Sequence, residues 1–211
     1  MHDIAATLAA QGIAAACPQY RLAPLHPYPA GVEDVQEFVR FARSRADEWN
    51  VTPSKVGAMG ISAGGHLALM LGLTNPPAPQ HWPREARSQV QAVVDICGLT
   101  DLTDPLSKHF EIAHSFLLQF MGAPPEGNDE VYKSASPLYH VSPDDPPMLI
   151  VHGEEDDVVP VAQSDALVDA LRLHGVEVEY HRLPGELHGF RPETSLQILD
   201  WTLRFFKEKL A

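Results

Sequence analysis

The sequence predicts an α/β fold, with one mostly parallel β-sheet that carries helices on both faces. Apolar segments of strand length alternate along the chain with segments whose apolar residues recur at helical spacing. Two strand segments, residues 90–97 and 147–151, are nearly continuous apolar runs, which is typical of strands covered on both faces in a parallel sheet. The chain has 211 residues, of which 45% are hydrophobic, and this suffices for one well-buried core. We therefore expect a single domain over residues 1–211.

The N-terminal part is predicted to hold two helices and one strand. Gly12 ends an amphipathic helix, and the apolar run at residues 13–19 predicts a strand. Three prolines make residues 20–29 an irregular loop, because proline lacks a backbone donor and fixes φ. Apolar residues at three- and four-residue spacing between Val32 and Trp49 then predict a helix with one buried face.

The middle of the chain is predicted to hold a strand, a helix and a second strand, followed by an insertion. The first strand covers residues 55–59, the helix residues 63–73, and the second strand the run at 90–97. Residues 98–146 are long and mixed in composition, so we interpret them as an insertion or lid over the edge of the sheet. A short helix is predicted within them, at residues 110–120.

The C-terminal part continues the alternation of strands and helices. The strand at residues 147–151 is followed by a predicted helix at 161–173 and a strand at 176–183. A loop at residues 184–190 then leads to a final helix at 193–209. This order favours a parallel sheet with crossover helices.

The formal net charge of −13 argues against a nucleic-acid partner and against anionic membrane surfaces, because both attract basic proteins. The substrate is therefore expected to be neutral or cationic. No apolar run approaches the ~18 residues that span a bilayer, and the N-terminus lacks the features of a signal peptide. If the chain starts at Met1, we expect it to be soluble and cytoplasmic, whereas a preceding segment would allow secretion.

The two cysteines, Cys17 and Cys97, both lie in apolar runs. Free cysteine packs as a small hydrophobic residue, so we predict two buried thiols, with a disulfide as the less favoured alternative. No cofactor is expected.

The run Gly60-Ile61-Ser62-Ala63-Gly64 has the pattern G-x-S-x-G and lies between a predicted strand and an alanine-rich helix. On composition alone, such a match occurs in roughly one chain of this length in fifteen, so the pattern by itself is weak. Its position makes it more specific, since a strained strand-to-helix turn requires small residues two positions on either side of the serine. The sequence therefore predicts Ser62 as a nucleophile, with a structural serine as the alternative.

A serine hydroxyl is a poor nucleophile unless an imidazole takes its proton and a carboxylate orients that imidazole. His188, in a glycine-flanked loop after one predicted strand, is the candidate base. Asp156, in a loop after another strand, is the candidate acid, in competition with the acidic residues at 154, 155 and 157. All three loops lie at the carboxyl edge of the sheet, where open α/β folds place their sites. The order Ser, Asp, His is that of an α/β-hydrolase.

The other histidines are interpreted as structural. His66 lies on the helix that leaves the predicted turn, and it should point away from the serine hydroxyl. His109, Glu111 and His114 are residue types that bind metals, but they do not place two imidazoles on one helical face as an i, i+4 pair would. We therefore predict no metal site.

Five parts of the chain form a recognisable set. They are Tyr20-Arg21-Leu22-Ala23-Pro24, Asp34, the run from Gly60 to Ala68, the run from His152 to Pro160, and His188-Gly189-Phe190. Together they resemble the α/β-hydrolase esterases and lipases of the hormone-sensitive-lipase and feruloyl- or acetylxylan-esterase-like groups. The resemblance covers essentially the whole chain. It implies that the acid is the residue four positions after His152, which is Asp156, and that His188 is the general base.

The chain departs from this resemblance at one point. Relatives of this kind carry a His-Gly-Gly-Gly-type loop upstream of the Tyr-Arg-Leu-Ala-Pro segment, and its N–H groups form much of the oxyanion hole. No such loop occurs here, so the backbone N–H of Ala63 is the oxyanion donor that can be identified. Loss of one donor typically costs about 10²–10³ in turnover. The resemblance also places a strand between residues 13–19 and 55–59, so we expect an N-terminally incomplete α/β-hydrolase fold and a truncated chain.

The resemblance implies a serine carboxylic-ester hydrolase that acts through an acyl-enzyme on small or acyl-sugar-type esters. The walls of its pocket are expected to come from the insertion, with the candidates Phe110, Phe116, Leu117 and Phe120. Two alternatives stay open, a weakly active or non-catalytic hydrolase-like fragment and a serine peptidase of the prolyl-oligopeptidase kind. The sequence makes no prediction of oligomeric state.

Overall fold

A four-stranded parallel sheet forms the centre of the molecule. The computed structural model describes residues 2–103 and 108–211. Within them the strand order is β1-β2-β3-β4, and each neighbouring pair is parallel. The strands are β1 Gly57–Ile61, β2 Ala92–Ile96, β3 Met148–Gly153 and β4 Val178–Leu183. The predicted α/β class with a mostly parallel sheet is confirmed.

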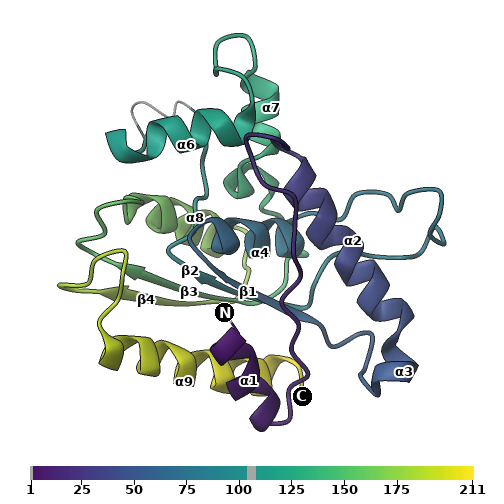
Figure 1. The fold of residues 1–211 in the computed structure, drawn as a ribbon. Helices are drawn as coiled ribbons and strands as arrows, with labels where there is room; N and C mark the ends of the chain where they lie inside the picture. Colours follow the sequence, from purple (N-terminus) through teal and green to yellow (C-terminus); the bar gives the residue numbers. More distant parts are fainter. Residues whose placement is uncertain (1, 104–107) are drawn as a thin grey trace.

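Helices cover both faces of this sheet (Figure 1). On one face α2 (Ala30–Ser44), α4 (Ala63–Leu73) and α8 (Ala162–Leu173) pack into one apolar core. On the other face α1 (His2–Ala10) and α9 (Pro192–Lys209) form a second core with the opposite side of the strands. None of the helices in the described part of the chain is long and apolar enough to cross a membrane.

The described residues of the 98–146 segment lie beside α4 and carry their own small core (Figure 1). They contain α6 (Glu111–Met121), α7 (Asp129–Ser134) and a 3₁₀ helix, η1 (Pro137–His140). The helix predicted at residues 110–120 is confirmed as α6. Residues 104–107 of this segment lie outside the described residues, and the interpretation of the segment as a lid stays a prediction.

The boundaries of most predicted elements agree with the structure to within a few residues. β1 begins at Gly57, two residues later than predicted, and it continues to Ile61. The single helix predicted between Val32 and Trp49 is divided at Arg45 into α2 and the short helix α3 (Ala46–Trp49). The apolar spacing does not detect this break, and the predicted buried face is wrong at Trp49, which is 42% exposed, whereas Ala46 is buried.

The predicted strand at residues 13–19 is wrong. The N–H of Ile13 donates to the carbonyl of Leu8, and residues 14–19 make no backbone hydrogen bond to another described residue. A strand needs a neighbouring edge, and β1 pairs only with β2 within the described chain. The prediction that Cys17 is buried fails for the same reason, because its run does not enter the sheet and its side chain is exposed, whereas Cys97 is buried as predicted.

Candidate active site

The G-x-S-x-G run forms a strained turn at the carboxyl edge of the sheet, as predicted. Ser62 follows the last residue of β1 directly and precedes the first residue of α4, with φ 57° and ψ −119°. This positive φ is unfavourable for a residue with a Cβ. The N–H of Ser62 donates to the carbonyl of Ile96 at 2.8 Å, and its carbonyl accepts from the N–H of His66 at 3.0 Å. The turn is therefore fixed to β2 on one side and to α4 on the other.

The glycine pattern of the turn is only partly explained by sterics. A Cβ on Gly60 would collide with the backbone carbonyl group of Gly64, so no larger residue fits at that position. A Cβ on Gly64 would meet nothing within 4 Å, so the expectation that both flanking positions must be small is wrong at Gly64. The second tight position is Gly65, where a Cβ would collide with the carboxylate of Asp95.

These contacts predict a large difference between two alanine variants. Gly60→Ala should lower the free energy of unfolding by about 2–3 kcal/mol, because the turn must shift to accept the methyl group. Gly64→Ala should stay within about 0.5 kcal/mol of the unmodified chain. Urea unfolding followed by circular dichroism measures both. Equal losses in the two variants would show that the turn is not closed as described.

Asp156 and His188 are brought together from two loops that are distant in sequence. Nδ1 of His188 donates to Oδ2 of Asp156 at 2.7 Å. The other carboxylate oxygen of Asp156 accepts the N–H groups of Val158 and Val159 at 2.8 and 2.7 Å. The Asp156 carboxylate is fully buried, whereas the acidic residues at 154, 155 and 157 are exposed. The structure thus joins His188 to the acid that the family resemblance selects.

The surroundings of Asp156 keep its carboxyl ionised. Burial acts to raise the pKa of Asp156, but hydrogen bonds from His152, from His188 and from the two backbone N–H groups outweigh it. The pKa of Asp156 therefore lies well below its usual value. His152 Nε2 is 3.3 Å from Oδ2 of Asp156, and it also contacts the carbonyl of Val159 at 3.0 Å. His152, recognised in the sequence only as part of a motif, thus stabilises the ionised carboxylate of Asp156.

Cys97 connects Ser62 to the Asp–His pair. Its Sγ and one ligand atom each of Asp156 and His188 all lie within 4.8 Å of one another. Cys97 follows Ile96, whose carbonyl accepts the N–H of Ser62. The backbone N–H of Ser62 also acts on the Cys97 thiol, so Ser62 and His188 both lie near Cys97, although no hydrogen bond joins the Ser62 hydroxyl to another described residue.

Cys97, Asp156 and His188 are all residue types that bind metals, but the protonated thiol and the Asp156–His188 hydrogen bond favour a proton relay. A metal binds the thiolate, and burial raises the pKa of the Cys97 thiol. Asp156 and His188 already share a hydrogen bond of 2.7 Å. His109 and His114 instead contact backbone carbonyls, those of Asp101 and His109 respectively.

His66 has the structural role that the sequence predicts. Its Nε2 contacts the carbonyl of Ala135 at 2.7 Å, and its ring packs edge-on against Phe120. Burial lowers the pKa of His66 to about 4, so the ring is neutral. It fastens α4 to the 98–146 segment.

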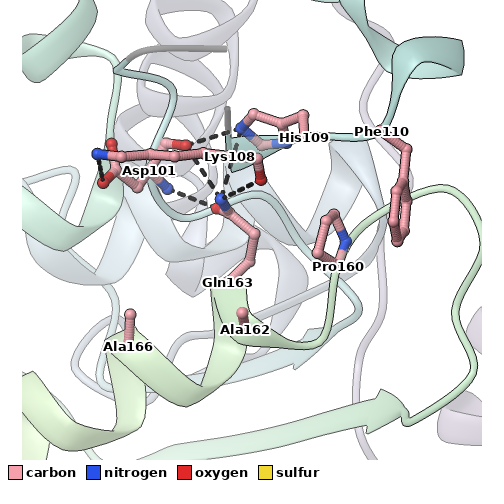
Figure 2. A pocket seen from close by; sticks show the side chains of 8 residues that line it. All are labelled: Asp101, Lys108, His109, Phe110, Pro160, Ala162, Gln163 and Ala166. Carbon is pink, nitrogen blue, oxygen red and sulfur yellow. Dashed lines mark hydrogen bonds and ion pairs between the residues drawn. The ribbon is translucent and has the colours of Figure 1, made fainter. Parts of the chain in front are cut away.

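A cavity of about 490 Å³ lies between that segment and the start of α8 (Figure 2). Gln163 lines it, and the Oε1 atom of Gln163 accepts from the backbone N–H groups of Thr100 and Asp101. Pro160, four residues after Asp156, forms part of the wall, so this cavity adjoins the acid loop. The lining residues are Asp101, Lys108, His109, Phe110, Pro160, Ala162, Gln163 and Ala166.

Of the four aromatic and aliphatic walls expected from the sequence, only Phe110 lines this cavity. Phe116 is 69% exposed, and Leu117 is buried in the core of the 98–146 segment. Phe120 packs against Tyr28 and His66. The helical spacing of these residues could not show which of them face the segment's own core.

The family model BD-FAE matches residues 1–171 of the chain. The chain belongs to the BD-FAE family. Among curated relatives, this BD-FAE member is 34% identical over 193 residues to the esterase LipC of Mycobacterium tuberculosis. The aligned region covers 90% of this chain and 48% of LipC. The chain spans about half the length, or slightly less, of such curated relatives, since it covers 44% of the probable carboxylic ester hydrolase LipM and 41% of the esterase LipQ, both from Mycobacterium tuberculosis.

Solved structures of hydrolases superpose on this BD-FAE chain. An acetyl ester-xyloside bifunctional hydrolase from Caldicellulosiruptor lactoaceticus superposes with a TM-score of 0.84 at 25% identity, over 98% of this chain and 75% of that one. A puromycin-hydrolyzing peptidase from Mycobacterium tuberculosis superposes with a TM-score of 0.73 at 26% identity, over 90% of this chain and 27% of that one. The fold is that of an α/β-hydrolase, and similar chains include both esterases and a peptidase.

Proposed function

We propose that this chain carries the nucleophile, base and acid of a serine carboxylic-ester hydrolase that acts through an acyl-enzyme. The observation that carries the proposal is the 2.7 Å hydrogen bond from His188 Nδ1 to the buried Asp156 carboxylate, at the sheet edge where Ser62 stands on a strained turn. Because Nδ1 holds the proton, Nε2 of a neutral His188 has a free lone pair. That nitrogen is the base.

The reaction proceeds in two acyl transfers. Ser62 Oγ attacks the ester carbonyl carbon while His188 Nε2 takes the hydroxyl proton, and Nε2 then gives this proton to the departing alcohol as the ester C–O bond breaks. Water attacks the acyl carbon, Nε2 takes its proton, and the serine oxygen leaves and regains a proton. Asp156 stays ionised throughout, consistent with its lowered pKa, and stabilises the imidazolium.

The backbone N–H of Ala63 is the proposed oxyanion donor. Ala63 is the first residue of α4, and its N–H makes no backbone hydrogen bond to a described residue. The first N–H groups of a helix lack partners within it, and the helix dipole favours negative charge there. This donor is thus free to bind the oxyanion that forms as Ser62 attacks.

Two sets of substrates fit the comparisons. The hydrolase from Caldicellulosiruptor lactoaceticus is described as acting on acetyl esters and xylosides, which supports small or acyl-sugar-type esters as substrates. The mycobacterial peptidase is described as hydrolysing puromycin, which keeps an amide substrate as the second candidate. A weakly active or non-catalytic fragment is the third alternative, because Ala63 is the single donor proposed here.

Turnover of paired model substrates separates these candidates. An esterase should hydrolyse p-nitrophenyl acetate well above the buffer rate and leave proline p-nitroanilides intact. The reverse preference would establish the peptidase. Rates equal to buffer for both substrates, in a chain that unfolds cooperatively, would support the fragment.

A further inference from the structure

The loop that carries His188 has few backbone hydrogen bonds, although the Phe190 side chain packs against the apolar core beside α9. It runs from the end of β4 to the start of α9, and residues 187–190 make no backbone hydrogen bond to another described residue. A general base must be held within a fraction of an ångström of its working position. Whatever fixes this loop therefore bears directly on the base.

Glu186 fixes one end of the loop to the other. Its Oε2 accepts the backbone N–H of Arg191 at 3.0 Å, and its Oε1 accepts Arg191 Nε and Thr194 Oγ1, each at 2.6 Å. Arg191 is the residue before α9, and Thr194 lies in its first turn. Glu186 is 2% exposed, and the hydrogen bonds from Thr194 and Arg191 lower the pKa of its carboxyl. The carboxylate thereby links the two ends of the segment 187–190, which contains His188.

The backbone of Glu186 contacts the loop of the acid. Its carbonyl accepts the N–H of Glu155 at 3.0 Å. The same carbonyl lies against Gly153 at the end of β3, where an added Cβ would collide with it. Glu186 thus contacts the segment just before Asp156 with its backbone and the start of α9 with its side chain.

We infer that Glu186 is a positioning residue, which holds His188 in register with Asp156 by closing the base loop against the acid loop and α9. This inference rests on the proposed function, in which His188 is the base. Glu186 itself has no contact with the Ser62 turn, so it acts through the position of the imidazole alone.

Two variants and one control test the inference. Glu186→Ala removes all three accepted hydrogen bonds, while Glu186→Gln keeps the size and one acceptor oxygen. Glu179→Gln is the matched control, because Glu179 is a β4 carboxylate paired with Arg204 and His181 that does not touch the base loop. In an ester assay, Glu186→Ala should lower kcat about 100-fold with little change in KM. The kcat of Glu186→Gln should lie between those of Glu186→Ala and the unmodified chain. The kcat of Glu179→Gln should equal that of the unmodified chain.

A measurement independent of turnover separates this inference from the proposed function. In ¹⁵N-histidine-labelled protein, the His188 Nδ1 proton shared with Asp156 should give a downfield resonance, assigned by its loss in Asp156→Asn. That resonance should be broadened or lost in Glu186→Ala and retained in Glu179→Gln. An unmodified chain that shows the resonance without turnover would refute the proposed function and still test Glu186.

Non-additivity is the second criterion. If Glu186 acts through the Asp–His pair, then Glu186→Ala should cost much less in the Asp156→Asn background than alone. A resonance and pH–rate profile unchanged by both Glu186 variants would overturn the inference, even if stability fell. Should Glu186→Ala not fold, Glu186→Gln and Thr194→Val carry the same test.

Discussion

Replacing Ser62 with alanine should abolish covalent labelling by a fluorophosphonate probe and reduce ester turnover to the buffer rate. The probe reacts with an activated serine oxygen, and Ser62, on the strained turn after β1, is the nucleophile proposed to act with the Asp156–His188 pair. The alanine side chain keeps the Cβ at the same positive φ, so the turn experiences no new strain. We therefore expect the variant to unfold at the same urea concentration as the unmodified chain.

Ser44→Ala provides the matched control for this experiment. The Ser44 hydroxyl is exposed near the end of α2 and donates to the carbonyl of Phe41, so it has no activating imidazole. Mass spectrometry of the labelled chain should find the phosphonate on the peptide that contains Ser62 in both the unmodified protein and the control. Undiminished labelling of Ser62→Ala would refute the assignment of the nucleophile.

Much of the fold and of the candidate site could be predicted because the signals are local. The turn at Ser62 depends on its immediate neighbours, and strand and helix periodicity place it at a sheet edge. The order of the three candidate residues and the motif that selects Asp156 then identify the candidate acid and base. The structure brings Asp156 and His188 to 2.7 Å of each other, from loops that follow β3 and β4.

The errors and omissions concern interactions between distant segments. Residues 13–19 have the composition of a strand, but a strand also requires pairing with a neighbouring strand. Residues 14–19 do not pair with the unpaired edge of β1 in the described chain, which the pattern cannot show. Gly64 matches the motif although its Cβ position is open, whereas the tight contact is made by Gly65 with Asp95, thirty positions along the chain. The contacts of Cys97 and Glu186 are equally invisible in sequence, because each depends on how two loops meet.

Asp95 is a buried carboxyl group that the sequence does not distinguish from an ordinary exposed aspartate. It lies in β2, and its side chain is fully buried against the backbone of Gly65 and Gly98. Neither carboxylate oxygen has a hydrogen-bond partner of good geometry among the described residues, although the backbone N–H of Gly98 lies close enough to act on the carboxyl. Burial raises the pKa of Asp95 to about 7, while the charge of His152 and the N–H of Gly98 act in the opposite direction. The native state therefore holds a proton here that the unfolded chain releases near its ordinary pKa of about 4.

This difference predicts a stability that falls as pH rises. Between pH ~4 and ~7 the native state binds more protons at Asp95 than the unfolded state does, so the free energy of unfolding decreases over this window. A shift of about three pKa units corresponds to at most about 4 kcal/mol. Asp95→Asn has no proton to lose, so its stability relative to the unmodified chain should rise by up to that amount from pH 4 to pH 8.

Urea unfolding of both proteins at several pH values measures this difference, and subtraction removes the contribution of other titrating groups. Asp101→Asn is the control, because Asp101 is also buried but its carboxylate pairs with Lys108 at 2.6 Å. It should lose stability near pH 7, since the amide cannot replace the ion pair. Parallel pH curves for Asp95→Asn and the unmodified chain would mean that Asp95 is hydrated or paired in solution. A stability difference that is constant below pH ~4, grows between pH ~4 and ~7 and is constant again above that window would instead establish a protonated Asp95 carboxyl.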